Sequence, residues 1–161
     1  LGAKYVILGH SENRANGDTD IIINKKINSA LKQKLTVIFC IGETIFQKRR
    51  KETNKIIKKQ ITQGLKGFKK NSRIIISYEP VWSIGTGIVP KNYELEKNIK
   101  FINSVILNGT KLKKVKILYG GSVNPKNIKN LNTINILDGY LIGGASQNAK
   151  KLIDIVKKSY N

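Results

Sequence analysis

Glu79 is a candidate general base, a residue that could accept a proton from a substrate. It ends an apolar run and is followed directly by Pro80. An ionised carboxylate within such a run is costly, but one that faces the rim of a sheet can act as a general base. The alternative is a glutamate at a strand end that simply reaches solvent.

His10 is the only histidine in the chain. It stands just before a polar turn, Ser11–Arg14, that could begin a short helix. A helix N-terminus disfavours a positive imidazolium nearby, which favours a neutral ring that donates a hydrogen bond. A single histidine is, on the other hand, more often a structural residue than a catalyst.

The segment Ser83–Gly87 has the composition of a mobile loop. Gly85 and Gly87 permit unusual backbone angles, and Pro80 stiffens the entry to the loop. A loop that closes over a substrate expels water from the site. A plain glycine turn would fit the same residues equally well.

The apolar runs that carry these residues predict five β-strands. Each run is nearly continuous instead of alternating with polar residues, which is typical of parallel strands covered on both faces. The predicted strands are Tyr5–Leu8, Thr36–Ile41, Ile74–Glu79, Val115–Tyr119 and Gly139–Ile142.

Lysine-rich stretches between the strands have the period of amphipathic helices. Their apolar stripes are Leu95, Ile99, Ile102 and Ile106; Ile57, Ile61, Leu65 and Phe68; and Ala149, Leu152, Ile153 and Val156. Strands that alternate with helices form right-handed βαβ units, so we expect an α/β protein with a parallel sheet. The sheet could be open and doubly wound or part of a closed (β/α)8 barrel, and periodicity does not choose between them.

Two glycine-rich segments follow the last two predicted strands. They are Tyr119-Gly120-Gly121-Ser122 and Gly143-Gly144. Their exposed N–H groups could hold a phosphate, particularly where a short helix begins. One Gly-Gly pair is a weak indication, whereas two match the place where barrel enzymes often hold phosphate.

Composition is that of an ordinary globular protein. The 161 residues are 40% hydrophobic, and no apolar run approaches the ~20 residues needed to span a bilayer. The single Cys40 lies in the apolar run Val37–Ile41, where we expect a buried, inert thiol and no internal disulfide. Because the chain starts with Leu1 at the edge of a strand, we expect further sequence upstream.

The formal charge of +20 raises the alternative of a nucleic-acid-binding module. Such a module would be expected to carry arginine clusters interleaved with aromatic residues. Lysine instead supplies 26 of the 30 basic residues and is spread along the whole chain. We therefore interpret the lysines as solvated, and expect neither nucleic acid nor a membrane as a partner.

Five motifs together resemble the triose-phosphate isomerase family. They are Val6–Glu12, Cys40–Glu43, Tyr78–Gly87, Tyr119–Val123 and Gly143–Ser146. They occur in the family's order and at about its spacing, and cover essentially the whole chain. The resemblance implies a partial (β/α)8, or TIM, barrel of about five βα units, from the family's fourth strand to its C-terminus.

The resemblance also implies a function. It predicts a cytoplasmic isomerase of glycolysis and gluconeogenesis that interconverts dihydroxyacetone phosphate and D-glyceraldehyde 3-phosphate through an enediol(ate). Another phosphosugar barrel enzyme is the alternative that the glycine loops alone would permit. No metal and no organic cofactor is implied.

The family's functional residues carry over to the matching positions. By resemblance, Glu79 is the base, His10 is the neutral electrophile, and Glu12 supports the electrostatic network around them. The predicted phosphate-binding residues are Gly85, Ser122, Gly143 and Gly144. The predicted lid and latch residues are Pro80, Val81, Trp82, Ser83, Ile84, Thr86, Gly87 and Tyr119.

Two departures from the family pattern stand out. The first three strand–helix units are missing, and with them an active-site lysine, an asparagine and the main loop of the family's homodimer interface. The lid's C-terminal hinge is Ile88-Val89-Pro90, where many members carry a lysine and small residues. We therefore expect residues 1–161, a single domain without three of its βα units, to be inactive on their own.

Overall fold

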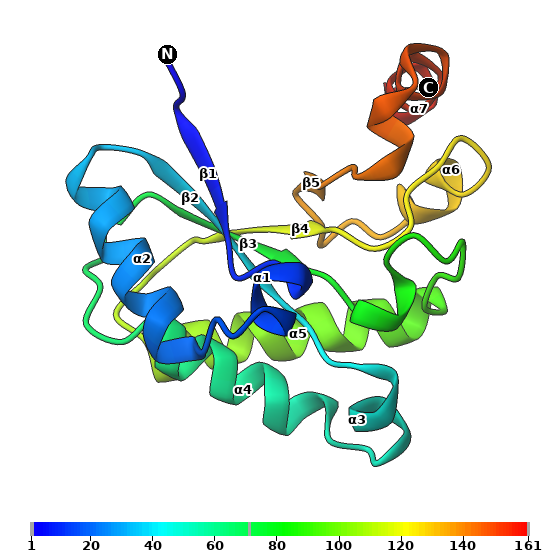
Figure 1. Cartoon of the computed structure of the whole chain (residues 1–161). Helices are drawn as coiled ribbons and strands as arrows, with labels where there is room; N and C mark the ends of the chain where they lie inside the picture. Colours follow the sequence, from blue (N-terminus) through cyan, green and yellow to red (C-terminus); the bar gives the residue numbers. More distant parts are fainter. Residues whose placement is uncertain (1, 71, 161) are drawn as a thin grey trace.

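Five parallel strands form one curved sheet with helices along one side (Figure 1). The computed structural model describes residues 2–70 and 72–160. The strands are β1 (Tyr5–Leu8), β2 (Thr36–Ile41), β3 (Ile74–Tyr78), β4 (Lys116–Tyr119) and β5 (Gly139–Tyr140). The helices are α1 (Ser11–Ala15), α2 (Asp20–Lys32), α3 (Ile45–Arg49), α4 (Thr53–Gly64), α5 (Asn92–Gly109), α6 (Ile128–Leu131) and α7 (Ala149–Tyr160), with short 3-10 helices η1 (Val81–Ser83) and η2 (Gly144–Gln147).

The strand order decides between the two possible sheets. The strands pair in the order β1-β2-β3-β4-β5, and every pair is parallel. A doubly wound sheet reverses its order at a switch point, whereas a barrel adds each new strand on the same side. The chain is therefore part of a (β/α)8 barrel.

The predicted strand bounds agree with the structure at β1 and β2 and differ elsewhere by one or two residues. Glu79 lies one residue beyond β3, and Val115 one residue before β4. β5 is two residues long because it pairs only with β4 within the described part of the chain. The pairing ends where Leu141 N–H donates to the carbonyl of Tyr119 at 2.9 Å.

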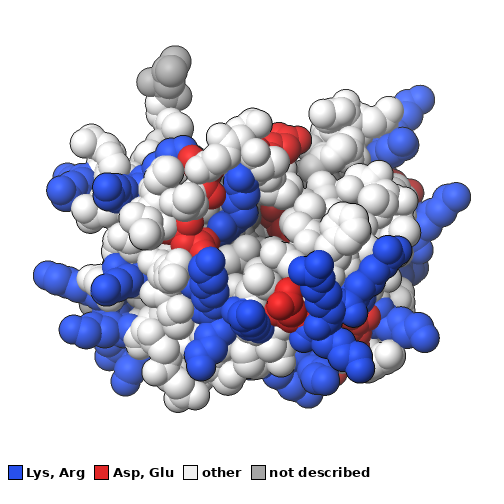
Figure 2. Space-filling model, turned by 60° about the horizontal axis from the view of Figure 1, so that its bottom comes forward, with Lys and Arg blue, Asp and Glu red and all other residues white. Residues whose placement is uncertain are grey.

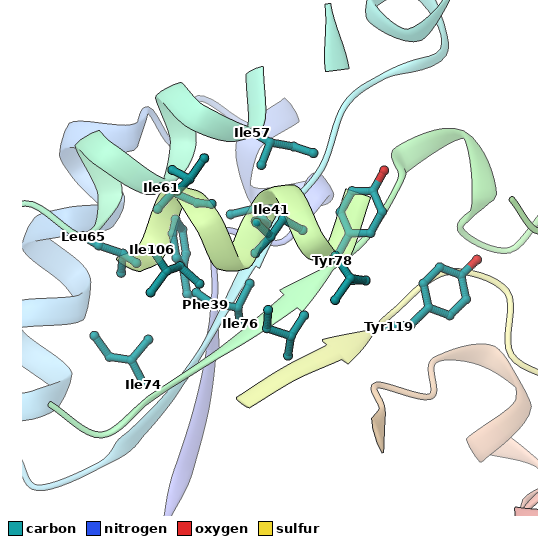
Figure 3. Packing of buried hydrophobic residues seen from close by; sticks show 14 of the residues in the cluster. Phe39, Ile41, Ile57, Ile61, Leu65, Ile74, Ile76, Tyr78, Ile106 and Tyr119 are labelled. Carbon is teal, nitrogen blue, oxygen red and sulfur yellow. The ribbon is translucent and has the colours of Figure 1, made fainter. Parts of the chain in front are cut away.

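The core lies between the sheet and helices α2, α4 and α5 (Figure 3). Strand side chains that face these helices, such as Phe39 and Ile76, are completely buried. The predicted stripe Leu95, Ile99, Ile102 and Ile106 is buried as expected. Every helix in 2–70 and 72–160 is too short or too polar to cross a bilayer.

The predicted stripe on the last helix is wrong. Ile153 and Val156 are 53% and 46% exposed, and Ile155 is the buried residue of α7. α7 lies beyond the β5 edge and contacts α6 and η2 instead of a central strand. Its buried face is therefore set by these neighbours.

The opposite face of the sheet is only partly covered. Ile38, Ile75 and Leu118 are half-buried there. Toward the carboxyl ends of the strands the same face becomes fully buried at Cys40 and Ser77. This is the end at which the polar residues gather.

Candidate active site

A cavity of about 620 Å³ opens at the carboxyl ends of the strands. Barrel enzymes carry their active sites at this end, on the loops that follow the strands. The predicted site residues that line it are His10, Glu79, Ile84, Gly85, Gly87, Ser122, Gly143 and Gly144. The remaining predicted residues, outside its lining, are Glu12, Pro80, Val81, Trp82, Ser83, Thr86 and Tyr119.

Glu79 lines this cavity, and one of its carboxylate oxygens is buried without a hydrogen-bond partner among the described residues. It follows β3 directly, and its side chain is almost completely buried. Oε1 accepts a hydrogen bond from Ser77 Oγ at 2.9 Å, whereas Oε2 has no hydrogen-bond partner in the described part of the chain. Burial raises the pKa of Glu79, and the hydrogen bond from Ser77 and the positive charge of Arg14 oppose the shift. A buried oxygen without a partner is poised to accept a proton.

His10 lies beside Glu79 in the wall of the cavity. It caps α1, and its Nδ1 accepts a hydrogen bond from the N–H of Glu12 at 3.4 Å. A neutral ring that accepts at Nδ1 carries its proton on Nε2. That Nε2 lies 3.7 Å from Oε2 of Glu79. The ring can therefore donate into the space beside the carboxylate.

Glu12 is placed less centrally. Its Oε2 lies 3.9 Å from Nδ1 of His10, but its side chain is 85% exposed and does not line the cavity. The structure thus brings Glu12 to the back of the imidazole, and its supporting role stays a prediction.

Two supporting residues, Ser77 and Arg14, were not predicted from the sequence. Ser77 holds Glu79, as described above. The guanidinium of Arg14 donates to the carbonyls of Gly9 at 2.7 Å and Cys40 at 3.2 Å, which ties the segment that carries His10 to β2. Cys40 is buried as expected, and burial, together with the charge of Glu79, raises the pKa of its thiol. Ser77 was the one polar residue in the run Ile74–Tyr78, a signal that could have been used.

The first turn of the lid is anchored on a buried acid that the prediction also missed. Trp82 Nε1 donates to Glu43 Oε1 at 2.9 Å, and the Tyr78 hydroxyl donates to Glu43 Oε2 at 3.1 Å. Burial raises the pKa of Glu43, and the hydrogen bond from Trp82 opposes the shift. Lys48 Nζ lies 3.7 Å from the centroid of the Trp82 ring, within cation–π range.

The tip of the lid is docked on the loop that follows β4. Gly85 and Gly87 have positive φ angles of 68° and 76°, as their residue type allows. The N–H of Gly87 donates to Ser122 Oγ at 2.9 Å, and that hydroxyl donates to the carbonyl of Ser83 at 2.6 Å. The lid and the Ser122 loop therefore form one wall of the cavity.

Gly143 and Gly144 form another part of the wall. They precede the first hydrogen bond of η2, from Ser146 N–H to the carbonyl of Gly143 at 2.9 Å. First-turn N–H groups have no intrahelical acceptor, which leaves them available to an anion. Lys126 and Lys151 line the same cavity and add positive charge.

The basic surface does not form a single band. On the face shown in Figure 2, lysine and arginine side chains are scattered among uncharged and acidic ones. Some of them are paired, as in Lys26–Asp18 at 2.7 Å and Lys48–Glu94 at 2.6 Å. This arrangement does not favour the nucleic-acid-binding alternative. In 2–70 and 72–160, no three His, Cys, Asp or Glu side chains are grouped so that they could hold a metal ion.

Comparison with known proteins agrees with the geometry. The sequence model of the family described as triosephosphate isomerase matches residues 1–159. The chain belongs to the triosephosphate isomerase family. It is 44% identical over 159 residues to the triosephosphate isomerase of Thermodesulfovibrio yellowstonii, covering 97% of this chain and 65% of that protein.

Other members of the triosephosphate isomerase family are similarly close. The protein of Geotalea uraniireducens is 41% identical over 164 residues, covering 98% of this chain and 65% of the relative. The protein of Mycoplasma mobile is 44% identical over 158 residues, covering 98% of this chain and 63% of the relative. The chain thus spans somewhat less than two thirds of the length of these relatives.

Proposed function

We propose that residues 1–161 are part of a triose-phosphate isomerase and contain its catalytic glutamate and histidine, Glu79 and His10. The reaction interconverts dihydroxyacetone phosphate and D-glyceraldehyde 3-phosphate. The observation that carries the proposal concerns Glu79, a buried residue in the wall of the cavity. Its Oε2 has no hydrogen-bond partner among the described residues and lies 3.7 Å from Nε2 of His10.

The proposed chemistry is a proton shuttle between two adjacent carbons. Glu79 takes the proton from the carbon beside the carbonyl, and the electron pair of the C–H bond moves to form the enediol(ate). His10 donates from Nε2 to the carbonyl oxygen and so stabilises the charge that develops there. His10 also passes the hydroxyl proton of the neighbouring carbon's oxygen to the former carbonyl oxygen, so that a new carbonyl can form. Glu79 then returns its proton to the carbon that carried the carbonyl. A glutamate base with a neutral histidine is the arrangement for which this family is itself the standard example.

The glycine-rich wall suits the substrate's phosphate. Gly85, Ser122, Gly143 and Gly144 would bind it through backbone N–H groups, since all four line the cavity. Lys126 and Lys151 would attract the dianion toward the opening, because charge of one sign at a cleft raises the local concentration of its ligand. Glu12 would support the imidazole from behind.

Family membership also supports a proposal for the oligomeric state, the substrate and the cellular location of the complete protein. We propose that the complete protein is a homodimer that acts on a small phosphorylated triose in the cytoplasm. The chain itself spans about 65% of its relatives, so these statements concern the protein to which it belongs.

The test replaces Glu79 by aspartate in the full-length protein. Glu79→Asp keeps the charge but withdraws the carboxylate, and a misplacement of about 1 Å can cost about 10²-fold in rate. Turnover is measured in both directions with coupled assays. Glu96→Asp is the matched control, because Glu96 is half-buried on α5 and pairs only loosely with Lys100 at 3.9 Å. Unchanged turnover of Glu79→Asp would contradict the proposal.

A further inference from the structure

Ser83 is a completely buried polar residue of the predicted lid. It is 0% exposed, although the lid residues that follow it up to Ile88 are partly or fully exposed. Its Oγ donates to the carbonyl of Ile88 at 2.6 Å and lies 2.8 Å from the hydroxyl of Tyr119. One side chain therefore contacts the far end of the lid and the end of β4 at once.

The direction of this hydrogen-bond chain follows from counting protons. A serine hydroxyl has a single hydrogen, and the carbonyl of Ile88 can only accept. Ser83 therefore donates to Ile88, and Tyr119 must donate to Ser83. Burial raises the pKa of Tyr119 to about 12, so its phenol keeps its proton at neutral pH. The chain runs Tyr119 to Ser83 to Ile88.

The surrounding backbone makes room for this arrangement. A Cβ added at Gly121 would lie 2.6 Å from Oγ of Ser83 and would also overlap the hydroxyl of Tyr119. Any side chain at this position would displace one of the two hydroxyls. The neighbouring Ser122 N–H also points at Oγ of Ser83, at 3.4 Å.

We propose that Ser83 is the positioning residue that holds the lid docked over the substrate phosphate. Its hydrogen bonds close the lid into a ring around Gly85 and Gly87 and attach that ring to β4 through Tyr119. The N–H of Gly85 then needs no reordering when an anion binds, and preorganisation of this kind improves binding. The inference rests on the proposed function of the cavity, but its structural part can be tested without turnover.

Trp82 supplies the signal for that test. It is the only tryptophan in this chain, it precedes Ser83 directly, and it is itself part of η1. Quenching of its fluorescence by acrylamide reports how often the first turn of the lid opens. In the full-length protein, any tryptophan outside this chain is first replaced by phenylalanine.

The variants are Ser83→Ala and Tyr119→Phe, singly and together. Loss of one buried hydrogen bond should increase the open population of the lid about fivefold. The quenching constant of Trp82 should rise with it, and the affinity for glycerol 3-phosphate, a non-reacting anion, should fall by a similar factor. Because Ser83→Ala already removes both hydrogen bonds of the chain, the double variant should have no larger effect than Ser83→Ala alone. Ser104→Ala is the control, since Ser104 Oγ makes a comparable bond to the carbonyl of Phe101 on the exposed side of α5.

The outcomes separate this inference from the proposed function. If both single variants fold, bind glycerol 3-phosphate like the unmodified protein and leave the quenching of Trp82 unchanged, Ser83 does not hold the lid. Additive effects of the two variants would also overturn the inference. Failure of the unmodified protein to turn over or bind any triose phosphate would instead contradict the proposed function, while the quenching results would still decide the role of Ser83. If Ser83→Ala does not fold, the quenching of Trp82 and the affinity for glycerol 3-phosphate are measured with Tyr119→Phe alone, which removes the hydrogen bond from Tyr119 to Ser83.

Discussion

Oε2 of Glu79 and Nε2 of His10 lie 3.7 Å apart, although they follow strands that are not neighbours in the sheet. Glu79 follows β3, His10 follows β1, and β2 stands between them. The curvature of the sheet brings the two loops together above β2. The carboxylate and the imidazole are therefore held by separate elements, and each can be changed without moving the other.

Glu79 gives the reaction a predictable dependence on pH. Burial raises its pKa above the usual value of 4.5, and the base must be ionised to accept a proton. We expect kcat/KM of the full-length protein to fall as the pH drops through this raised pKa, so that the acid limb of the profile lies above pH 4.5.

Ser77→Ala provides the check on that profile. The hydrogen bond from Ser77 favours the charged form of Glu79, so its removal should move the acid limb to higher pH. Glu96→Gln, on the surface of α5, should leave the limb in place. An acid limb at or below the usual glutamate value would contradict the assignment of Glu79 as the base.

Gly120 is predicted to be intolerant of any side chain. A Cβ at this position would lie 2.5 Å from Cγ of Glu79 and 2.6 Å from Oγ of Ser77. We expect Gly120→Ala to displace the carboxylate and to reduce kcat by about 10²-fold, because misplacement of a reacting group by about 1 Å has an effect of this size.

A matched glycine substitution separates displacement of the Glu79 carboxylate from a general loss of stability. A Cβ added at Gly109, at the end of α5, would lie 3.3 Å from the methyl group of Thr62 and 3.8 Å from a methyl group of Val105, on the helical side of the sheet. Gly109→Ala should leave kcat unchanged. Thermal unfolding of both variants, measured by circular dichroism, controls for stability. Normal activity of Gly120→Ala would mean that Glu79 is not held as tightly as the structure indicates.

The strands could be predicted from the sequence because apolar runs leave a local signal. β2 contains the continuous apolar run Val37–Ile41 and ends before Gly42, and its predicted bounds were correct. Ser77 and Arg14 were missed because their importance lies in contacts with Glu79 and Cys40, which are brought to them only by the fold. The buried face of α7 was missed for the same kind of reason. A helical stripe marks which residues are apolar, but the neighbours decide that Ile155 is covered and Val156 is not.

The charge of +20 should produce only weak binding of nucleic acid. Scattered lysines neutralise phosphates without reading bases, so we expect sequence-independent binding with a Kd of about 10⁻⁴ to 10⁻⁶ M at physiological salt. Fluorescence anisotropy with two unrelated duplexes and one single strand, each titrated at several salt concentrations, measures it. Tight binding of one sequence over the others would support the nucleic-acid-binding alternative.

The final prediction concerns residues 1–161 expressed alone. Within 2–70 and 72–160, β1 pairs only with β2 and β5 only with β4, so each has one unpaired edge. Tyr5 and Ile7 on β1 are 60% and 47% exposed, and the inner face at Ile38 and Leu118 is only half-buried. Unpaired parallel edges and exposed apolar faces favour association with other chains. We therefore expect self-association, non-cooperative unfolding and no measurable isomerase activity.

Co-expression with the missing part of the barrel tests whether the open strand edges cause the expected self-association and inactivity. The Thermodesulfovibrio yellowstonii relative contains a portion, about 35% of its length by difference from the 65% covered, that this chain does not match. Co-expression with that portion should reduce self-association, because added strands can pair with the free edges of β1 and β5 and cover the inner face. Size-exclusion chromatography and a coupled isomerase assay give the two readouts, with Glu79→Gln in this chain as the inactive control. A soluble, cooperatively unfolding monomer that shows full activity without the added portion would show that the open edges do not limit this chain.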